Sequence, residues 1–487
     1  MIGRFLGEYA KNAGYALLFG RFLQSKSGAR LQNSRQIGQW LNARNTGLLI
    51  DGDQGRLSER VSFQNVCVTA SVGTGKTTRY IIPNVLDKAK QNCSIVVNDP
   101  KGEVFDITSG YMQAHGFEVL VINPENLSAS SFFNPLAEAK TDIEIEQVAE
   151  ILIKAGTGGK AKDPIWDNGA IRLISVLLKL LQRAGYVEPG YFTLGNLYYL
   201  LQNFGQDGSP LDDFVIKWAY NPEDPNDSSL WDEWKGVITG NDKAVQSFVL
   251  TALVALKAFT NADMVKLTAS SSINLEDMRK RKTIIYFITP PQLAEYYGFF
   301  TSVFFRSVFN AMMRRLPAQN DLSVFCLYDE FGHSTLPGFG AVANTIRGYR
   351  VSLSIILQSL AQLSMRYGDD YAKAIQGGFT TYMTYTASDD ETSKFFERRA
   401  GRVVEKQKNK IEEMLDHRNE YNLLNADEIS RIGDMEAILL SSNQQPARIE
   451  TVPYFQHPRF RRIEKRYGSA SLRSQGMVPA PKKVPLA

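Results

Sequence analysis

The segment Ala70-Ser-Val-Gly-Thr-Gly-Lys-Thr77 constrains the fold more than any other part of this 487-residue chain. It follows a short apolar run, Asn65 to Thr69, which we expect to be a strand, and a helix is predicted to begin at Thr77. A glycine-rich turn between a strand and a helix directs backbone N–H groups toward one point, where a phosphate group is stabilised. The segment therefore predicts an α/β fold with a phosphate-binding loop.

Individual residues of this loop have separate predicted roles. The ammonium group of Lys76 would pair with the β- and γ-phosphates, and the Thr77 hydroxyl would bind Mg²⁺. Ala70 stands where the strict GxxxxGK[ST] pattern has glycine, but its small side chain is one that the first turn often tolerates. ATP and Mg²⁺ are the predicted ligands. The residues expected to bind the nucleotide are Ala70, Ser71, Val72, Gly73, Thr74, Gly75, Lys76, Thr77 and Thr78.

Two carboxylates follow a second apolar run, Leu322 to Tyr328. Phosphoryl transfer to water needs one acid near the Mg²⁺ ion and another that polarises the attacking water. We expect Asp329 to bind Mg²⁺ and Glu330 to be the catalytic base. A strand that ends in two solvated acids is common by itself, but its pairing with the phosphate loop favours the catalytic interpretation.

The predicted catalytic set contains Lys76 and Glu330. Three further residues are candidates for it. Gln358 follows the apolar run Val351 to Leu357 and could sense the γ-phosphate or orient water. Arg347 and Arg350 come shortly before that run. Either arginine could supply positive charge to the ATP of a neighbouring subunit, and either could equally be a surface residue.

The other apolar runs show strand-like and helix-like patterns in alternation. Helical patterns at Val104 to His115 and Ala294 to Arg315 separate several short strand-like runs. Strands that alternate with helices form parallel sheets. We therefore expect an α/β fold with a central, mostly parallel sheet. Its further strands are predicted at Gly47 to Asp53, Ser94 to Asn98, Phe117 to Ile122, Thr283 to Ile288 and Thr380 to Tyr385.

A long stretch between Thr141 and Phe259 has a different character, because helical periodicity dominates it and strand patterns vanish. This stretch predicts an all-helical domain that splits the sheet in sequence. Its clearest helical patterns cover Ile143 to Ala155, Gly169 to Ala184, Thr193 to Asn203 and Asp242 to Phe259.

The cysteines and the two termini indicate in which cellular compartment the protein is expected. Cys67, Cys93 and Cys326 lie in apolar runs without metal-ligand spacing, so neither disulfides nor a zinc site is predicted and a reducing cytoplasm fits. The N-terminal apolar runs are too short for a membrane span and suggest a docking helix. From Thr451 to Ala487, eight Lys or Arg residues stand against one Glu. We expect a flexible basic tail, with contact to nucleic acid or an acidic partner as the alternative.

Ordered motifs along the chain resemble those of one family. They are Gly73-Thr-Gly-Lys-Thr77, Ile81-Ile-Pro-Asn84, Asn98-Asp-Pro-Lys-Gly-Glu103, Phe133-Asn-Pro-Leu136, Asp163-Pro-Ile-Trp-Asp167, Tyr328-Asp-Glu-Phe331, Ile346-Arg-Gly-Tyr349, Leu357-Gln-Ser359, Leu423 to Ile432 and Gln445-Pro-Ala-Arg448. In this order they resemble the TraG/TraD-type coupling proteins of conjugation and type IV secretion, which are ATPases related to the FtsK and HerA DNA pumps.

The resemblance implies a RecA-like P-loop NTPase core with an inserted all-α domain, assembled as a homo-hexamer with ATP between subunits. It ranks Arg347 above Arg350 as the arginine finger. Asp99, Lys101 and Glu103 match a motif near the nucleotide, with a buried ion-pair cluster as the alternative interpretation. The implied parts are an N-terminal helical or docking segment (1–44), the core (45–139 and 275–455), the insert (140–274) and the basic flexible tail (456–487).

The function implied by the resemblance is ATP-driven transfer of DNA. The DNA is expected to be single-stranded and linked to a relaxase, and the partners would be the relaxase or relaxosome or a secreted protein cargo, type IV secretion ATPases and a membrane partner. Family members usually have two N-terminal membrane-spanning helices, which are not predicted here, so we expect a cytoplasmic protein, peripheral at the inner face of the cell membrane. One alternative is a FtsK/HerA-like pump of duplex DNA, which would not require the helical insert. Another is an ATP-dependent recruitment platform for protein effectors.

Overall fold

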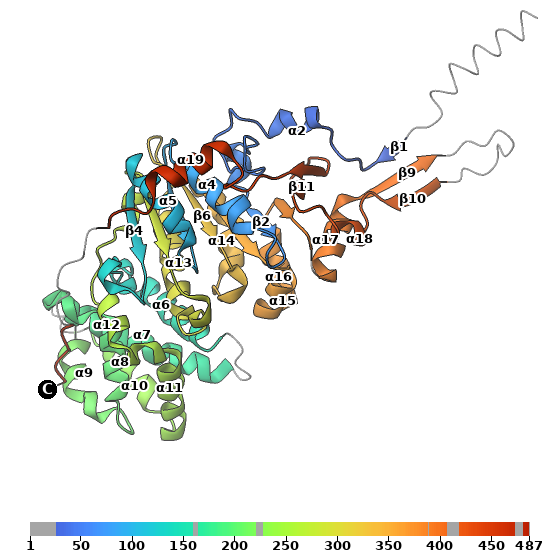
Figure 1. Cartoon of the computed structure of the whole chain (residues 1–487). Coiled ribbons are helices and arrows are strands. Elements are labelled where there is room, and N and C mark those ends of the chain that lie inside the picture. Colours follow the sequence, from blue (N-terminus) through green and yellow to red (C-terminus); the bar gives the residue numbers. More distant parts are fainter. Residues whose placement is uncertain are drawn as a thin grey trace, which may run out of the picture.

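A computed structural model describes residues 26–158, 164–220, 227–387, 389–406, 418–472 and 481–486. The docking helix expected within the first 25 residues lies outside this range. Figure 1 shows a sheet flanked by helices, with an all-helical part beside one end of it and a small second sheet projecting from the other.

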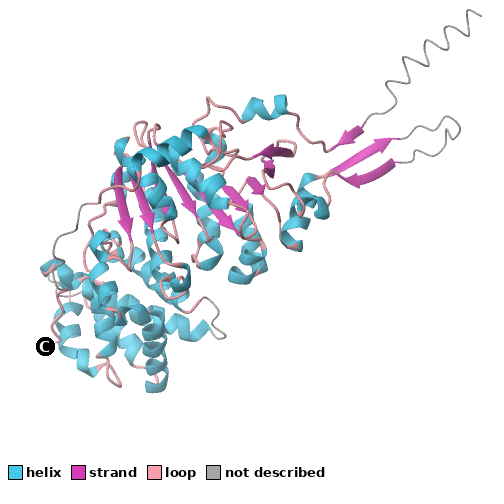
Figure 2. Cartoon of the chain, viewed as in Figure 1, coloured by secondary structure: helices cyan, strands magenta, loops and turns pink. Residues whose placement is uncertain are grey.

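The main sheet of the described chain has nine strands in the order β12-β11-β8-β2-β7-β6-β3-β5-β4. All pairs from β8 to β4 are parallel, and β8, β11 and β12 pair antiparallel, which confirms a mostly parallel sheet (Figure 2). The strands are β2 (Val66–Thr69), β3 (Cys93–Asn98), β4 (Glu118–Ile122), β5 (Thr283–Phe287), β6 (Ser323–Tyr328), β7 (Val351–Leu357), β8 (Thr381–Thr384), β11 (Glu436–Ser441) and β12 (Ala447–Glu450).

Helices cover both faces of this sheet, which is why its inner strands are continuous apolar runs. Along β6, Phe325 and Leu327 pack on the side of α4 and α5, while Val324 and Cys326 pack on the side of α13 and α14. The helices on the two faces of the sheet and around it are α2 (Ser34–Trp40), α3 (Glu59–Ser62), α4 (Ile82–Lys88), α5 (Glu103–Ala114), α13 (Gly298–Met313), α14 (Phe339–Thr345), α15 (Ala361–Tyr367), α16 (Asp369–Gly377), α17 (Asp390–Ala400) and α18 (Ala426–Ile429).

The strand predicted at Gly47 to Asp53 is wrong. Leu49 forms only an isolated bridge with Arg56, and the chain turns back on itself there. The side chain of Asn84 donates to the Leu49 carbonyl and accepts from the Leu49 N–H, both at 2.8 Å. Leu48, Leu49 and Ile50 are apolar because they are fully buried against α4, and the Asn84 side chain satisfies the Leu49 backbone in place of a neighbouring strand.

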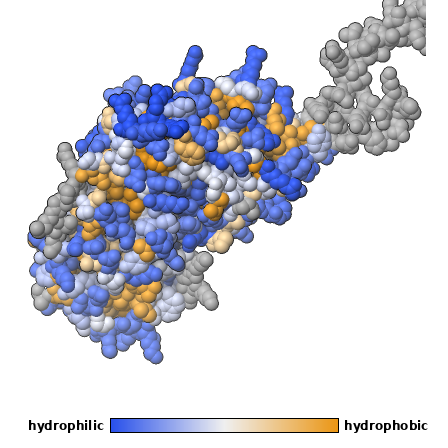
Figure 3. Space-filling model, in the orientation of Figure 1, coloured by the Kyte–Doolittle hydropathy of each residue, from blue (hydrophilic) through white to orange (hydrophobic). Residues whose placement is uncertain are grey.

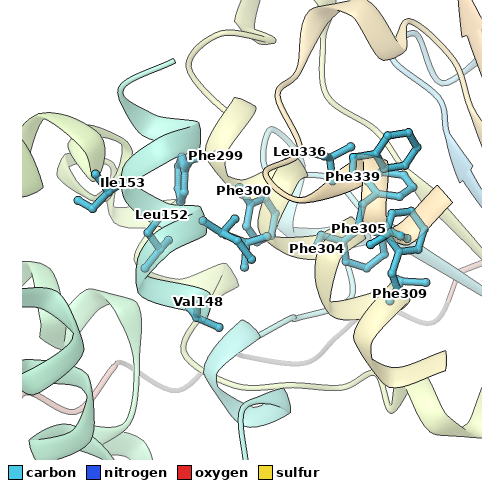
Figure 4. Close-up of a cluster of buried hydrophobic side chains, with 14 of the residues drawn as sticks. Val148, Leu152, Ile153, Phe299, Phe300, Phe304, Phe305, Phe309, Leu336 and Phe339 are labelled. Carbon is cyan, nitrogen blue, oxygen red and sulfur yellow. The ribbon is translucent and has the colours of Figure 1, made fainter. Parts of the chain in front are cut away.

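Between β4 and β5 the described chain is helical, as the periodicity predicted. Its helices are α6 (Asp142–Gly156), α7 (Pro164–Val187), α8 (Leu194–Gln202), α9 (Asp212–Ala219), α10 (Ser229–Ile238), α11 (Asp242–Ala255) and α12 (Ala262–Leu267). Figure 4 shows phenylalanines of α13, among them Phe299 and Phe300, beside Leu152 of α6. One apolar core therefore runs from the sheet through α13 into the insert.

Parts of the tail expected to be flexible are folded. Residues 458–467 form α19 (Pro458–Tyr467), which packs along α5 and buries Phe460 and Ile463. Its exposed arginines and lysine form the deep blue, hydrophilic surface over this helix in Figure 3. Residues 481–486 lie against the all-helical insert, where Val484 is buried. The tail is basic, but its few apolar residues suffice to dock it.

The projecting sheet consists of β1 (Lys26–Gly28), β9 (Arg402–Lys406) and β10 (Arg418–Asn422), all antiparallel. None of the helices in the described ranges combines the length and the apolar character needed to cross a membrane.

Candidate nucleotide-binding site

The predicted site residues follow three neighbouring strands of the main sheet. The phosphate loop comes after β2, Gln358 after β7, and Asp329 and Glu330 after β6, and the sheet order is β2-β7-β6. Because these strands are parallel, their carboxyl ends meet at one edge, where ligands of open α/β sheets bind. The structure thus brings together all the predicted site residues except Arg347.

The loop backbone shows which positions need glycine. Gly73 and Gly75 both have a φ of 81°, in the left-handed region that disfavours other residues. Ala70 does not have a positive φ, and its N–H donates to the Leu357 carbonyl at 3.0 Å, which extends the pairing of β2 with β7. Alanine therefore fits the position where the strict pattern has glycine.

Hydroxyl groups fix the shape of the loop from inside. Ser71 Oγ donates to the Thr386 carbonyl at 2.7 Å, and Thr74 Oγ1 donates to the Ser71 carbonyl at 2.7 Å. Thr78 Oγ1 donates to the Gly75 carbonyl at 3.0 Å. Val72 projects from the loop with 79% of its surface exposed. The loop backbone is held by its own side chains and by Thr386, two residues after β8, so its N–H groups are oriented in advance for a phosphate group.

Glu330 is held by both of its carboxylate oxygens. Oε1 lies 2.6 Å from the ammonium nitrogen of Lys76, and the two side chains are 18% and 12% exposed. Oε2 accepts a hydrogen bond from Gln358 Nε2 at 3.2 Å, and His333 Nε2 lies 3.8 Å from the same oxygen. Gln358 therefore contacts the predicted base directly.

Asp329 is more deeply buried and faces Thr77. Thr77 Oγ1 donates to Asp329 Oδ2 at 3.1 Å. Burial raises the pKa of the Asp329 carboxyl from 3.8 to about 6, and the positive charge of Lys76 opposes this rise. A hydroxyl oxygen beside a carboxylate oxygen is a donor set that Mg²⁺ accepts. The described residues contain no group of three His, Cys, Asp or Glu side chains that could bind a metal, so the other ligands of such an ion would be phosphate and water.

Arg347 lies near the amino-terminal end of β7, whereas these residues follow the carboxyl ends of the strands. It belongs to a 3₁₀ turn, Ile346–Tyr349, that precedes β7, and a strand of this length spans ~23 Å. Its side chain is exposed and makes no hydrogen bond or ion pair with any described residue. Arg350, by contrast, donates to the Ala318 carbonyl of the same chain at 3.2 Å.

Asn98 is a site residue that the sequence patterns did not identify. It ends β3, the neighbour of β6, and its Nδ2 donates to the Asp329 carbonyl at 2.7 Å. Its Oδ1 atom is buried without a hydrogen-bond partner in the described structure. Asn98 begins the motif Asn98 to Glu103, but only the strand order shows that this motif lies beside the turn that carries Asp329 and Glu330.

Asp99 does not belong to a buried ion-pair cluster. Lys101 is exposed, and no ion pair joins Asp99, Lys101 and Glu103 in the described structure. Asp99 Oδ2 instead accepts a hydrogen bond from the Phe105 N–H at 2.8 Å, in the first turn of α5. Burial raises the pKa of Asp99 from 3.8 to about 7, and its hydrogen bonds to the helix backbone oppose this rise.

Solved structures with low sequence identity share this architecture. Plasmid coupling protein TrwB in complex with ADP and Mg²⁺ superposes with a TM-score of 0.70 at 13% identity, over 88% of this chain and 94% of that chain. TrwB in complex with an ATP analogue gives 0.67 at 12% identity, over 94% and 97%. VirB4 of Thermoanaerobacter pseudethanolicus gives 0.51 at 13% identity, over 87% and 98%. The fold is therefore a RecA-like P-loop α/β fold with an all-helical insert.

Sequence comparison then identifies the family. Residues 24–475 match the model of the type IV secretory system conjugative DNA transfer family, and the chain belongs to this family. Protein VirD4 of Rhizobium radiobacter is 24% identical over 422 residues, 82% of this chain and 59% of the relative. Conjugal transfer protein TraG of Escherichia coli is 29% identical over 126 residues, 25% of this chain and 19% of the relative. The chain thus spans about 59% of the length of VirD4.

Substitution of Asp99 tests the burial of its carboxyl. A folded-state pKa of about 7 against 3.8 means that the folded protein holds the proton more tightly, so Asp99 lowers stability as pH rises from 4 to 7. Asp99→Asn keeps the oxygen that accepts from Phe105 but lacks this pH dependence. At pH 8 we expect the variant to be more stable than the wild type by on the order of 2–4 kcal/mol, and the gap to close near pH 4.

Thermal unfolding of both proteins between pH 4 and pH 8 measures this difference. Asp106→Asn, at an exposed position in the first turn of α5, is the matched control and should follow the wild type. If the unfolding temperatures of the wild type and Asp99→Asn change with pH in parallel, the Asp99 carboxyl is not desolvated.

Proposed function

We propose that this chain is an ATP-hydrolysing coupling motor that recruits DNA and moves it to a type IV secretion or conjugation channel. The observation that carries the proposal is the meeting of Lys76, Thr77, Asp329, Glu330 and Gln358 at one sheet edge. Membership of the conjugative DNA transfer family supports DNA as the cargo. Solved TrwB complexes with ADP and Mg²⁺ and with an ATP analogue support the ligands.

Each site residue has a role that its contacts support. Lys76 would bind the β- and γ-phosphates, and Thr77 and Asp329 would bind Mg²⁺, which neutralises phosphate charge. Phosphate oxygens carry more negative charge than a carboxylate, so they would take Lys76 from Glu330. The released Glu330 oxygen would then accept a proton from the attacking water, while Gln358 holds the other oxygen and senses the γ-phosphate.

Arg347 would act on the nucleotide of a neighbouring subunit. It is exposed, free of partners among the described residues, and separated from the site in its own chain by the length of β7. An arginine finger supplied in this way stabilises transition-state charge. This assignment requires ATP at the interface between subunits, and the family resemblance suggests a homo-hexameric ring.

The cargo and the setting follow from the same proposal. The cargo would be single-stranded DNA linked to a relaxase, with the relaxosome, type IV secretion ATPases and a membrane partner as contacts at the inner face of the cell membrane. Contacts to DNA would be mostly to phosphates, and so sensitive to salt. The helices from α6 to α12 favour a coupling motor over a FtsK/HerA-like pump of duplex DNA, which does not require such an insert.

Lys76→Ala tests the phosphate site. Loss of the ammonium group removes the charge that holds the β- and γ-phosphates, so we expect ATP hydrolysis to fall on the order of 100-fold or more. A phosphate-release assay measures the rate, and thermal unfolding checks the fold. Lys90→Ala, at an exposed position after α4, is the matched control and should hydrolyse ATP at the wild-type rate. Full activity of Lys76→Ala would disprove the site.

Mixing of inactive subunits tests the shared site. Arg347→Ala and Glu330→Gln should each be inactive alone, and activity should return on mixing, because some interfaces then combine an intact Glu330 with an intact Arg347. Native mass spectrometry confirms that mixed rings form. Arg350→Asn is the control, since asparagine tolerates the positive φ at that position and Arg350 is engaged within its own subunit. Mixed rings without any recovered activity contradict the assignment of Arg347.

Stimulation by DNA separates the motor from its alternatives. ATPase rates are compared with single-stranded DNA, duplex DNA and a relaxase-bound strand, and the proposal predicts that the single strand, free or relaxase-bound, stimulates most. Stimulation should weaken steeply between about 50 and 200 mM salt. A maximum with duplex DNA would support the pump instead, and a rate unaffected by any DNA would support a recruitment platform for protein effectors.

A further inference from the structure

Residues 481–486, near the end of the chain, lie along a groove on the all-helical insert. The groove is formed by α8, α12 and the residues around them, including Asn196, Tyr199, Phe259 and Val265, and Pro481, Lys482 and Lys483 line the part of it that stays open. The segment is far in sequence from these helices. Its contacts are of the kind that bind an extended peptide, and they can be separated into backbone and side-chain recognition.

Asn196 recognises the backbone of the segment. It is buried, its Nδ2 donates to the Lys482 carbonyl at 2.9 Å, and its Oδ1 accepts from the Val484 N–H at 3.1 Å. In an extended chain the carbonyl of one residue and the N–H two residues later point to the same side, so one carboxamide can bind both. Asn196 also donates to the Tyr191 carbonyl at 3.0 Å, which holds the amide in place.

Side chains fix which residues the groove prefers. Lys482 Nζ lies 2.6 Å from Glu188 Oε2, and the Val484 side chain is 1% exposed. Lys483 Nζ lies 5.0 Å from the centre of the Tyr199 ring. Lys482 and Val484 thus meet a carboxylate and an apolar pocket two residues apart, while Pro485 is exposed.

We propose that this groove is a peptide-binding site for extended segments with a lysine followed two residues later by valine, and that the chain's own residues 481–486 occupy it until a protein partner presents such a segment. Backbone recognition by one asparagine does not depend on which chain supplies the peptide. The ion pair at the rim is partly exposed, so it can select lysine over an acidic residue without preventing exchange of the bound segment. The site is separate from the ATP site, and the inference does not depend on the proposed motor function.

Competition by the attached segment provides the test. In the full chain, Val484→Asp places a charge in an apolar pocket and should release the segment. A fluorescent peptide, Ala-Pro-Lys-Lys-Val-Pro-Leu-Ala, is then titrated and followed by anisotropy. We expect it to bind the Val484→Asp chain at least about tenfold more tightly than the wild type, whose own segment competes at high effective concentration. Equal binding to both chains, or no binding to the variant, would overturn the proposal.

A charge exchange tests the register of the peptide. Glu188→Lys, added to the Val484→Asp chain, should weaken binding of this peptide, and a peptide with glutamate in place of its first lysine should restore it. A peptide with aspartate in place of valine should bind neither chain, and thermal unfolding checks that the variants are folded. If Glu188→Lys binds the lysine and glutamate peptides equally, the groove does not recognise the segment in the way proposed.

Discussion

The ion pair between Lys76 and Glu330 depends on one constraint, the order of parallel strands at the centre of the sheet. The two residues follow β2 and β6, which lie on either side of β7. Only a parallel arrangement places the ends of all three strands at the same edge. Gln358, at the end of the strand between them, then reaches Glu330 from the middle. The candidate site therefore exists because of the strand order, and the contacts of Lys76, Thr77 and Gln358 with the two acids cross from one strand end to another.

The all-helical insert is joined to this site by continuous packing. Phe305 of α13 stacks on Tyr328, the residue before Asp329, with ring centres 4.2 Å apart. Other phenylalanines of the same helix contact α6, as Figure 4 shows, and a single apolar cluster contains all of them. Close-packed protein interiors have few voids, so a displacement on one side of such a cluster is passed on to the other side. The insert and the acidic turn thus form one body, although the insert interrupts the sheet in sequence.

Local patterns predicted the loop, the acidic pair, Gln358 and the helical insert, because each is encoded within a few residues or by a sustained periodicity. Contacts that depend on strand order were not predictable, and Asn98 is the clearest of these. Two errors have local causes. In the Gly47 to Asp53 run, Leu48, Leu49 and Ile50 are apolar because they are buried, and Asn84 takes the place of a strand partner for Leu49. In α19, Phe460, Ile463 and Tyr467 have helical spacing, but the surrounding arginines obscured it.

The turn that carries the two acids explains why both can act on one loop. Side chains of successive residues in a strand point to opposite faces, yet Asp329 contacts Thr77 and Glu330 contacts Lys76, which are neighbours. The strand ends at Tyr328, and Glu330 has a φ of 52° in the left-handed region, which is unfavourable for a residue other than glycine. Such strain persists where surrounding contacts hold it, and here Lys76 and Gln358 hold the carboxylate. The strained backbone at Glu330 is therefore what turns two consecutive carboxylates toward the same phosphate site.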